Sequence, residues 1–337
     1  MKARATRCPE IAVGILMAAT VLLTTGCACG PCTENPKATK VERIAYHGWK
    51  NALRLQNQRV EVVVVPEVGR VMSFRFRDGA NVFWEDCSLD GGRGDWQAKE
   101  WINFGGDKTW PAPEAEWGHY TKRKDWRPPP AFDSLVVEAR IDGNDVVLTS
   151  PVDPYYGVRT VRRIQLAGSA TAMTITTTYE RVSGEPSRIG VWVITQFNEP
   201  AAIYVPVRTN SVWTNGYYVF GTQPWPQLEA KIDHLKITRD LKSPHKMGSD
   251  ASRLLWVGEK DMCLVSSPRV SDGEYPDRGA SAEVYTNPDP KKYIELELLG
   301  TLSLMKPGDR ITQQSTYALF KRNYRDPDKE RQALLAR

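Results

Sequence analysis

The sequence predicts an all-β protein, and three observations lead to this prediction. Short segments rich in β-branched and aromatic residues recur from Val41 onward, turn signals separate them, and no helical periodicity precedes the C-terminal end. Many strands at short spacing without intervening helices indicate a sandwich or barrel-like fold. Because the pattern contains no mid-chain linker, we expect one domain over residues 42–322 and a polar C-terminal tail over residues 323–337.

The strands are expected where these segments lie, and turn pairs such as Asp78-Gly79 and Ser183-Gly184 separate several of them. The expected strands cover residues 59–65, 71–76, 135–141, 145–149, 158–166, 172–179, 189–197, 253–257, 262–266, 293–299 and 311–320. Residues 86–133 show no strand pattern and are expected to form a long loop. A loop of this length in a compact domain is usually functional or disordered.

Two of the expected strands place polar or aromatic side chains opposite the core. Side chains alternate between the two faces of a strand. This alternation puts Trp192 and Gln196 on the face opposite the apolar set of their strand. On a later strand it puts Glu295 and Glu297 on one face, roughly 6.5–7 Å apart, as the rise of two residues requires.

The N-terminus has the pattern of an export signal. A basic start precedes an uncharged run over residues 11–23, and small residues follow it. The run is too short to span a bilayer as a helix, which needs about 20 residues. Residues 23–27 (LTTGC) resemble a bacterial lipobox, which implies a signal peptide over residues 1–26, lipidation of Cys27 and a tethering linker over 27–41. We therefore expect a lipid-anchored protein of the cell envelope, on its periplasmic or outer-surface side; cleavage without a lipid is the alternative.

The cysteines and the charges agree with export but reveal no chemistry. Cys29 and Cys32 are interpreted as a small disulfide or as free thiols in the linker, and a disulfide between Cys87 and Cys263 stays open. The formal net charge is +5, and basic and acidic residues are interspersed, which argues against nucleic acid as a partner.

No cofactor or metal is expected. Nucleotide-binding, serine-hydrolase and zinc-protease motifs are absent from the sequence. Asp86, Asp90 and Asp95 do not have the spacing of a calcium-binding loop and are interpreted as an acidic surface loop.

The stretch from residue 84 to residue 126 has an unusual composition. Its indole rings can stack on the C–H faces of a sugar, while Asn103, Asp107 and Lys108 can bond the hydroxyl groups. The alternative is that the rings only close one end of the sandwich. Six of the eleven tryptophans lie here: Trp84, Trp96, Trp101, Trp110, Trp117 and Trp126.

Six motifs stand out, at residues 66–71 (PEVGRV), 81–84 (NVFW), 103–111 (NFGGDKTWP), 192–196 (WVITQ), 293–297 (YIELE) and 304–308 (LMKPG). Together they resemble the galactose mutarotase-like superfamily, and within it an uncharacterised bacterial group, a domain of unknown function. One glycine of the usual early turn is absent. The resemblance implies a large antiparallel β-supersandwich with a concave carbohydrate site.

The resemblance also implies roles for particular residues. Mutarotases of this superfamily use a late-strand glutamate as base, which corresponds to Glu297, with Glu295 as the alternative register. They use a histidine as acid, but Gln196 stands at the expected position and His119 is the nearest substitute. The binding residues implied or proposed are Arg70, Trp101, Asn103, Asp107, Lys108, Trp110, Trp192 and Gln196.

Three hypotheses follow. The first is a tethered carbohydrate-binding protein without evident catalysis. The second is an aldose 1-epimerase-type isomerase, or another sugar-active enzyme, with Glu297 as general base. The third is a structural envelope lipoprotein that keeps the fold and recognises another protein.

Overall fold

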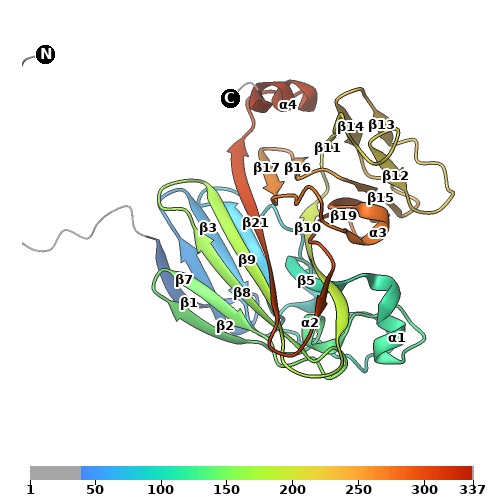
Figure 1. Cartoon of the computed structure of the whole chain (residues 1–337). Coiled ribbons are helices and arrows are strands. Elements are labelled where there is room, and N and C mark those ends of the chain that lie inside the picture. Colours follow the sequence, from blue (N-terminus) through green and yellow to red (C-terminus); the bar gives the residue numbers. More distant parts are fainter. Residues whose placement is uncertain (1–38, 336–337) are drawn as a thin grey trace, which may run out of the picture. The chain divides into compact units, whose positions relative to one another are not determined.

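A computed structural model describes residues 39–335, which form two antiparallel β-sheets with a shared apolar interior (Figure 1). The all-β prediction is therefore confirmed. The signal peptide, the lipidation site Cys27 and the pair Cys29 and Cys32 lie outside the described residues.

The first sheet has eleven strands. Ten of them follow one another across the sheet, and β20 (Ser303–Met305) pairs with β10 beside this path. The order is β1 (Lys40–Tyr46), β2 (Trp49–Gln56), β3 (Val60–Val65), β4 (Arg70–Phe76), β5 (Asp107–Ala112), β10 (Ser187–Asn198), β19 (Tyr293–Leu299), β18 (Ala282–Thr286), β15 (His245–Ser249) and β12 (Tyr217–Val219).

The second sheet has ten strands and includes the longest hairpins of the chain. Their order is β13 (Leu228–Ala230), β14 (His234–Ile237), β11 (Ala202–Pro206), β16 (Arg253–Val257), β17 (Asp261–Ser266), β21 (Arg310–Lys321), β9 (Ala172–Arg181), β8 (Val158–Leu166), β7 (Asp145–Thr149) and β6 (Glu138–Asp142).

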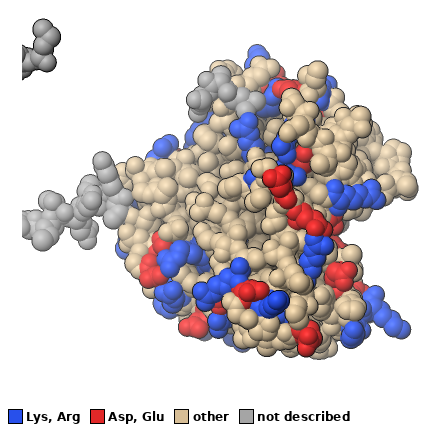
Figure 2. Space-filling model, in the orientation of Figure 1, with Lys and Arg blue, Asp and Glu red and all other residues tan. Residues whose placement is uncertain are grey.

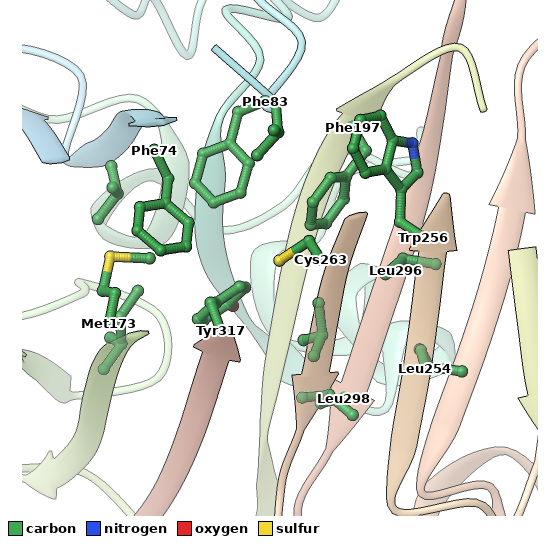
Figure 3. Close-up of a cluster of buried hydrophobic side chains, with 14 of the residues drawn as sticks. Phe74, Phe83, Met173, Phe197, Leu254, Trp256, Cys263, Leu296, Leu298 and Tyr317 are labelled. Carbon is green, nitrogen blue, oxygen red and sulfur yellow. The ribbon is translucent and has the colours of Figure 1, made fainter. Parts of the chain in front are cut away.

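The main core lies between the sheets, where strands of both contribute apolar side chains (Figure 3). Phe83 packs edge-to-face on Phe197 of the first sheet and on Tyr317 of the second, with ring centroids 5.2 and 6.0 Å apart. Interiors packed in this way bury apolar surface, which is the main favourable term in folding.

The alternation predicted for the two site strands is confirmed. Thr195 of β10 points into the interior, where its hydroxyl lies 2.9 Å from that of Tyr317. Trp192 and Gln196 point to the other face, where they bond carboxylates of β19. Strand β10 therefore contributes to the core with one face and to a possible ligand surface with the other.

The prediction that residues 86–133 lack strands is wrong for β5. This strand lies between β4 and β10 in the first sheet. Pro111 hid it, because proline is rarely compatible with a central strand. Strand β4 pairs with β5 only through Val71 and Asp107, so most of β5 pairs with β10 alone. The Pro111 carbonyl accepts the Trp117 indole N–H.

The rest of this segment forms four short helices. They are η1 (Cys87–Leu89), η2 (Glu114–Glu116), α1 (Trp117–Thr121) and α2 (Pro130–Asp133). A further short helix, α3 (Pro276–Gly279), lies before β18.

The segment expected to be a polar tail contains a helix, α4 (Pro327–Leu335). Asp328 of this helix accepts hydrogen bonds from Tyr204 of β11 (2.8 Å) and Lys236 of β14 (2.7 Å). Leu334 packs against the apolar side chains of the same region. Strand β1 likewise starts at Lys40, inside the segment expected to be linker.

Three further observations concern the thiols, the surface charges and the lengths of the helices. Cys87 is exposed and Cys263 is buried, and both are free, so the disulfide that the sequence left open does not form. On the face shown in Figure 2, basic and acidic side chains are interspersed. Among residues 39–335, no helix is long and apolar enough to cross a bilayer.

Candidate ligand-binding site

A pocket of about 400 Å³ lies on the face of the first sheet that is turned away from the core. Strands β10, β15, β18 and β19 supply its floor, and the segment from Trp101 to Trp126 supplies one wall. The lining residues are Trp101, Trp110, Glu114, Trp126, Trp192, Lys246, Tyr285, Asn287, Tyr293, Glu295 and Glu297.

Four tryptophans in mutual contact form the aromatic wall. Trp101 packs edge-to-face on Trp110 and on Trp126, with centroids 5.6 and 5.4 Å apart. Trp110 packs in the same way on Trp192 at 5.7 Å. Trp126 is 50% exposed, so its ring is accessible from solvent. Such edge-to-face contacts fix ring orientation, which keeps the wall rigid.

Asp133 of α2 holds this wall in place. Its two carboxylate oxygens accept the indole N–H groups of Trp101 (2.9 Å) and Trp110 (3.1 Å). The same carboxylate pairs with the buried Arg70 at 2.8 Å, and Arg70 also donates to the carbonyl of Gly105. A single buried anion therefore orients two rings and neutralises one buried cation.

The turn that leads into β5 requires glycine. Gly105 has φ of +93°, and a Cβ there would lie 2.1 Å from the Trp84 carbonyl oxygen. The buried Asn103 accepts the Gly105 N–H through Oδ1 at 3.2 Å. Asn103 thus shapes the turn that places Lys108 and Trp110 on the pocket side.

One half of the pocket floor is built around Glu295. Its Oε1 accepts hydrogen bonds from Gln196 (2.7 Å) and from Lys108 (3.3 Å). The Lys108 ammonium also lies 4.6 Å from the Trp110 ring centroid, in cation–π geometry. Burial lowers the Lys108 pKa, and Glu295 partly offsets this change.

The other half is built around Lys246 of β15. Its ammonium lies 2.7 Å from Glu283 and 3.0 Å from Glu297, which are direct cross-strand neighbours. The Trp192 indole donates to Glu297 at 2.8 Å. Burial raises the pKa of both carboxyls, most strongly that of Glu283, and Lys246 partly offsets the rise. Burial therefore favours the protonated form of this pair of carboxyls.

The structure brings together five of the residues proposed from the sequence. Trp101, Trp110, Trp192, Glu295 and Glu297 all line the pocket. Lys108, Gln196, Arg70 and Asn103 are buried and do not line it. Lys108 and Gln196 bond a lining carboxylate, Arg70 bonds Asp133, and Asn103 shapes the turn.

Two proposed residues lie elsewhere. Asp107 precedes Lys108 by one position and points into the interior, where it pairs with Arg162 and accepts the hydroxyls of Thr195 (2.7 Å) and Tyr317 (2.5 Å). His119 is exposed on α1 and does not line the pocket.

Sequence reasoning missed several lining or supporting residues: Glu114, Asp133, Lys246, Glu283, Tyr285 and Asn287. A signal for two of them was present. In β18 (AEVYT), alternation places Glu283 and Tyr285 on one face and the apolar residues on the other. No sequence signal pairs Asp133 with tryptophans more than twenty positions away.

Two other cavities have different chemistry. One of about 580 Å³ is polar and includes Arg208, Arg253 and Arg269. Another of about 510 Å³ is largely apolar and lies beside α4. The second of these has the rings of Tyr204 and Phe320 beside Asp233 and His234, but neither cavity is lined by tryptophan as the first pocket is. Among the described residues, no group of three or more ligating side chains could hold a metal ion.

The fold is that of the galactose mutarotase-like proteins. The match to the structure of a galactose mutarotase-like protein from Lactobacillus casei covers 80% of this chain and 100% of that protein's chain, with TM-score 0.56 and 10% sequence identity. A galactose mutarotase related enzyme from Lactobacillus acidophilus matches over 82% and 98%, with TM-score 0.51 and 11% identity. The resemblance seen in the sequence is confirmed for the fold.

Residues 51–214 match the family described as Domain of unknown function (DUF4380). A TPR-domain containing protein from Parabacteroides distasonis is also similar, with TM-score 0.55 and 12% identity over 81% of this chain. The chain spans 47% of the length of that protein. No curated protein sequence matches the chain.

Proposed function

We propose that this protein binds a carbohydrate in the aromatic pocket. The observation that carries the proposal is the wall of four contacting tryptophans above a floor of hydrogen-bonding Glu and Lys groups. Apolar ring faces suit the C–H faces of a sugar, and carboxylates and ammonium groups suit its hydroxyls. The fold of the similar proteins named above supports the same class of ligand.

A glycan array followed by calorimetry tests this proposal. Trp126→Ala and Trp101→Ala are expected to weaken binding at least tenfold, because each removes a stacking face. Trp96→Ala is the matched control, since Trp96 lies in the same segment and packs on Tyr155 outside the pocket lining. Absence of binding to every sugar, or equal losses in all three variants, would contradict the proposal.

A second candidate function is aldose 1-epimerase-type isomerisation at the same site. Glu297 and Lys246 favour it, because a base and an ammonium 3.0 Å apart suit two oxygens bonded to one anomeric carbon. Glu297 would take the proton of the anomeric hydroxyl while the bond from that carbon to the ring oxygen breaks. The ring oxygen would take a proton from a water molecule while the Lys246 ammonium stabilises its negative charge, and reclosure on the other face would reverse both transfers.

Polarimetry separates this candidate from binding alone. We expect Glu297→Gln to abolish any acceleration of α-to-β interconversion while sugar binding persists. If the wild-type protein accelerates interconversion no more than Glu297→Gln does, the protein is a binder and not an isomerase.

We also propose that Cys27 anchors the protein to the cell envelope through a lipid. The proposal rests on the lipobox-like residues 23–27 of the sequence. Incorporation of labelled fatty acid and recovery in the membrane fraction are expected, and Cys27→Ser should remove both. An unlabelled protein with an unchanged distribution in that variant would contradict the anchor.

A further inference from the structure

The charges around the pocket are unevenly distributed. On the side of Trp101 and Trp110, each cation has its own anion: Lys108 pairs with Glu295, and Arg70 pairs with Asp133. That side is therefore neutral in total.

The side of Lys246 has an excess of carboxylates. Lys246 is shared by Glu283 and Glu297, at 2.7 and 3.0 Å. Asp277 and Glu114 also interact electrostatically with Lys246, but neither forms an ion pair with any residue among 39–335. Two carboxyl groups thus share one ammonium at ion-pair distance, and two more interact with it electrostatically.

The buried part of this cluster is incompletely bonded. Glu283 is fully buried, and its Oε1 has no hydrogen-bond partner among the described residues. Burial raises the pKa of Glu283, Glu297 and Asp277. Burial disfavours the ammonium of Lys246, but the adjacent Glu283 and Glu297 outweigh this and hold its pKa well above the usual value. The raised pKa of Lys246 reports the negative potential that Glu283 and Glu297 create around it.

The remaining polar groups facing this side do not balance it. Tyr218 of β12 donates its hydroxyl to the Asp277 backbone carbonyl at 2.9 Å. Arg278 packs over the Tyr218 ring, 5.3 Å from its centroid. Glu295 is already paired with Lys108. A metal ion does not explain the excess either, because no three ligating groups of the described chain converge.

We propose that the carbohydrate bound here carries a free ammonium group, as an unacetylated amino sugar does, with Glu114 as its partner in the pocket wall. This inference rests on the proposed carbohydrate binding. The sugar ring would lie on the neutral, tryptophan-lined side, and its ammonium would point to the carboxylate-rich side. Trp126 and Tyr285 offer further ring faces to a cation.

Calorimetry with matched sugar pairs tests this inference on the purified full-length protein. Glucosamine, galactosamine and mannosamine are each compared with the parent hexose, which differs only by the amine. We expect at least one amino sugar to bind tenfold or more tighter than its parent hexose, and this difference to shrink at high salt. Binding should also release protons, because a bound ammonium lowers the pKa of nearby carboxyls.

Two exposed glutamates of η2 give a variant and its control. Glu114 lines the pocket and Glu116 does not. Glu114→Gln should lower the ratio of amino-sugar affinity to hexose affinity by most of its excess, whereas Glu116→Gln should leave this ratio unchanged. Equal affinity for amino sugar and hexose, or equal effects of the two variants, would overturn the ammonium inference while carbohydrate binding stands. If no sugar of either kind binds, both proposals fail.

Discussion

Asp133 shows how one side chain can organise a site without entering it. It accepts both indole N–H groups of the wall and pairs with Arg70, whose guanidinium is almost fully buried. Its role is positional, so its loss should affect binding through the two rings and stability through the unpaired cation.

Asp133→Asn should destabilise the protein by about 3–5 kcal/mol, because removing one partner of a buried ion pair leaves an uncompensated charge. Urea unfolding measures this cost. Sugar affinity should fall as well, since an amide offers a single acceptor oxygen to two indoles. A loss under 1 kcal/mol with unchanged sugar affinity would show that Asp133 holds neither the two indole rings nor the Arg70 guanidinium.

Glu283 should make stability depend on pH. Its folded-state pKa is raised, so the folded protein keeps a proton that the unfolded chain has lost above pH 4.5. The free energy of unfolding therefore falls as pH rises through this range. Glu283→Gln removes the titrating group, so it should flatten the slope and stabilise the protein at pH 8, where the folded wild type must hold a proton that the unfolded chain has lost.

Lys246→Met is the opposite test of the same cluster. It leaves Glu297 buried without its counterion and removes a partner of Glu283, so we expect a loss of about 3–5 kcal/mol at pH 8. Combining it with Glu283→Gln should recover part of the loss. If Lys246→Met and Glu283→Gln shifted the unfolding curve in the same direction, this account of the cluster would be contradicted.

Individual residues also show how much of the site the sequence could predict. Trp192, Glu295 and Glu297 were placed on the pocket face because strand alternation needs only the local sequence. Asp107 was grouped with Lys108 because both lie in one motif, yet consecutive residues of a strand point to opposite faces. Asp133 and Lys246 depend on contacts between distant segments, which no local pattern contains.

Among the elements, β5 and α4 differ most from expectation. Strand β5 was concealed by Pro111, because proline lacks a backbone N–H and is rarely found inside a strand. Helix α4 is short and polar, and its amphipathic character is weak, so its existence depends on docking to β11 and β14 more than on its own propensity.

Leu334→Ala tests whether α4 is docked. Leu334 is partly buried against an apolar cluster that includes Tyr204 and Leu255. We expect a cost of about 1–2 kcal/mol, less than for a fully buried leucine. Thermal unfolding measures it, and sugar affinity should be unchanged because α4 does not line the aromatic pocket. An unaltered Tm would mean that the helix contributes nothing to the fold.

For the whole molecule, the two-layer arrangement followed from strand number and spacing, but strand order did not. The first sheet places β5 next to β10, and β10 next to β19, although these strands are far apart in sequence. Composition and periodicity report which segments are strands. They do not report which strands pair, because pairing depends on the three-dimensional path of the connections.

The two thiols of the described chain provide a test of this core. Cys263 is fully buried and burial raises its pKa, whereas Cys87 is exposed. Alkylation followed by peptide mass spectrometry should label Cys87 in the native protein and Cys263 only after unfolding. Equal labelling of both peptides under native conditions would show that the sheets do not enclose Cys263.

The contacts among the pocket tryptophans have an optical consequence. Trp101, Trp110 and Trp192 lie with neighbouring ring centroids only 5.6 and 5.7 Å apart, and the Lys108 and Lys246 ammonium groups sit 4.6 Å from Trp110 and Trp192. Excitation can migrate among rings at such separations, and a nearby cation shifts indole emission. The protein therefore contains its own spectroscopic reporter, and occupancy can be followed by intrinsic fluorescence without any attached dye.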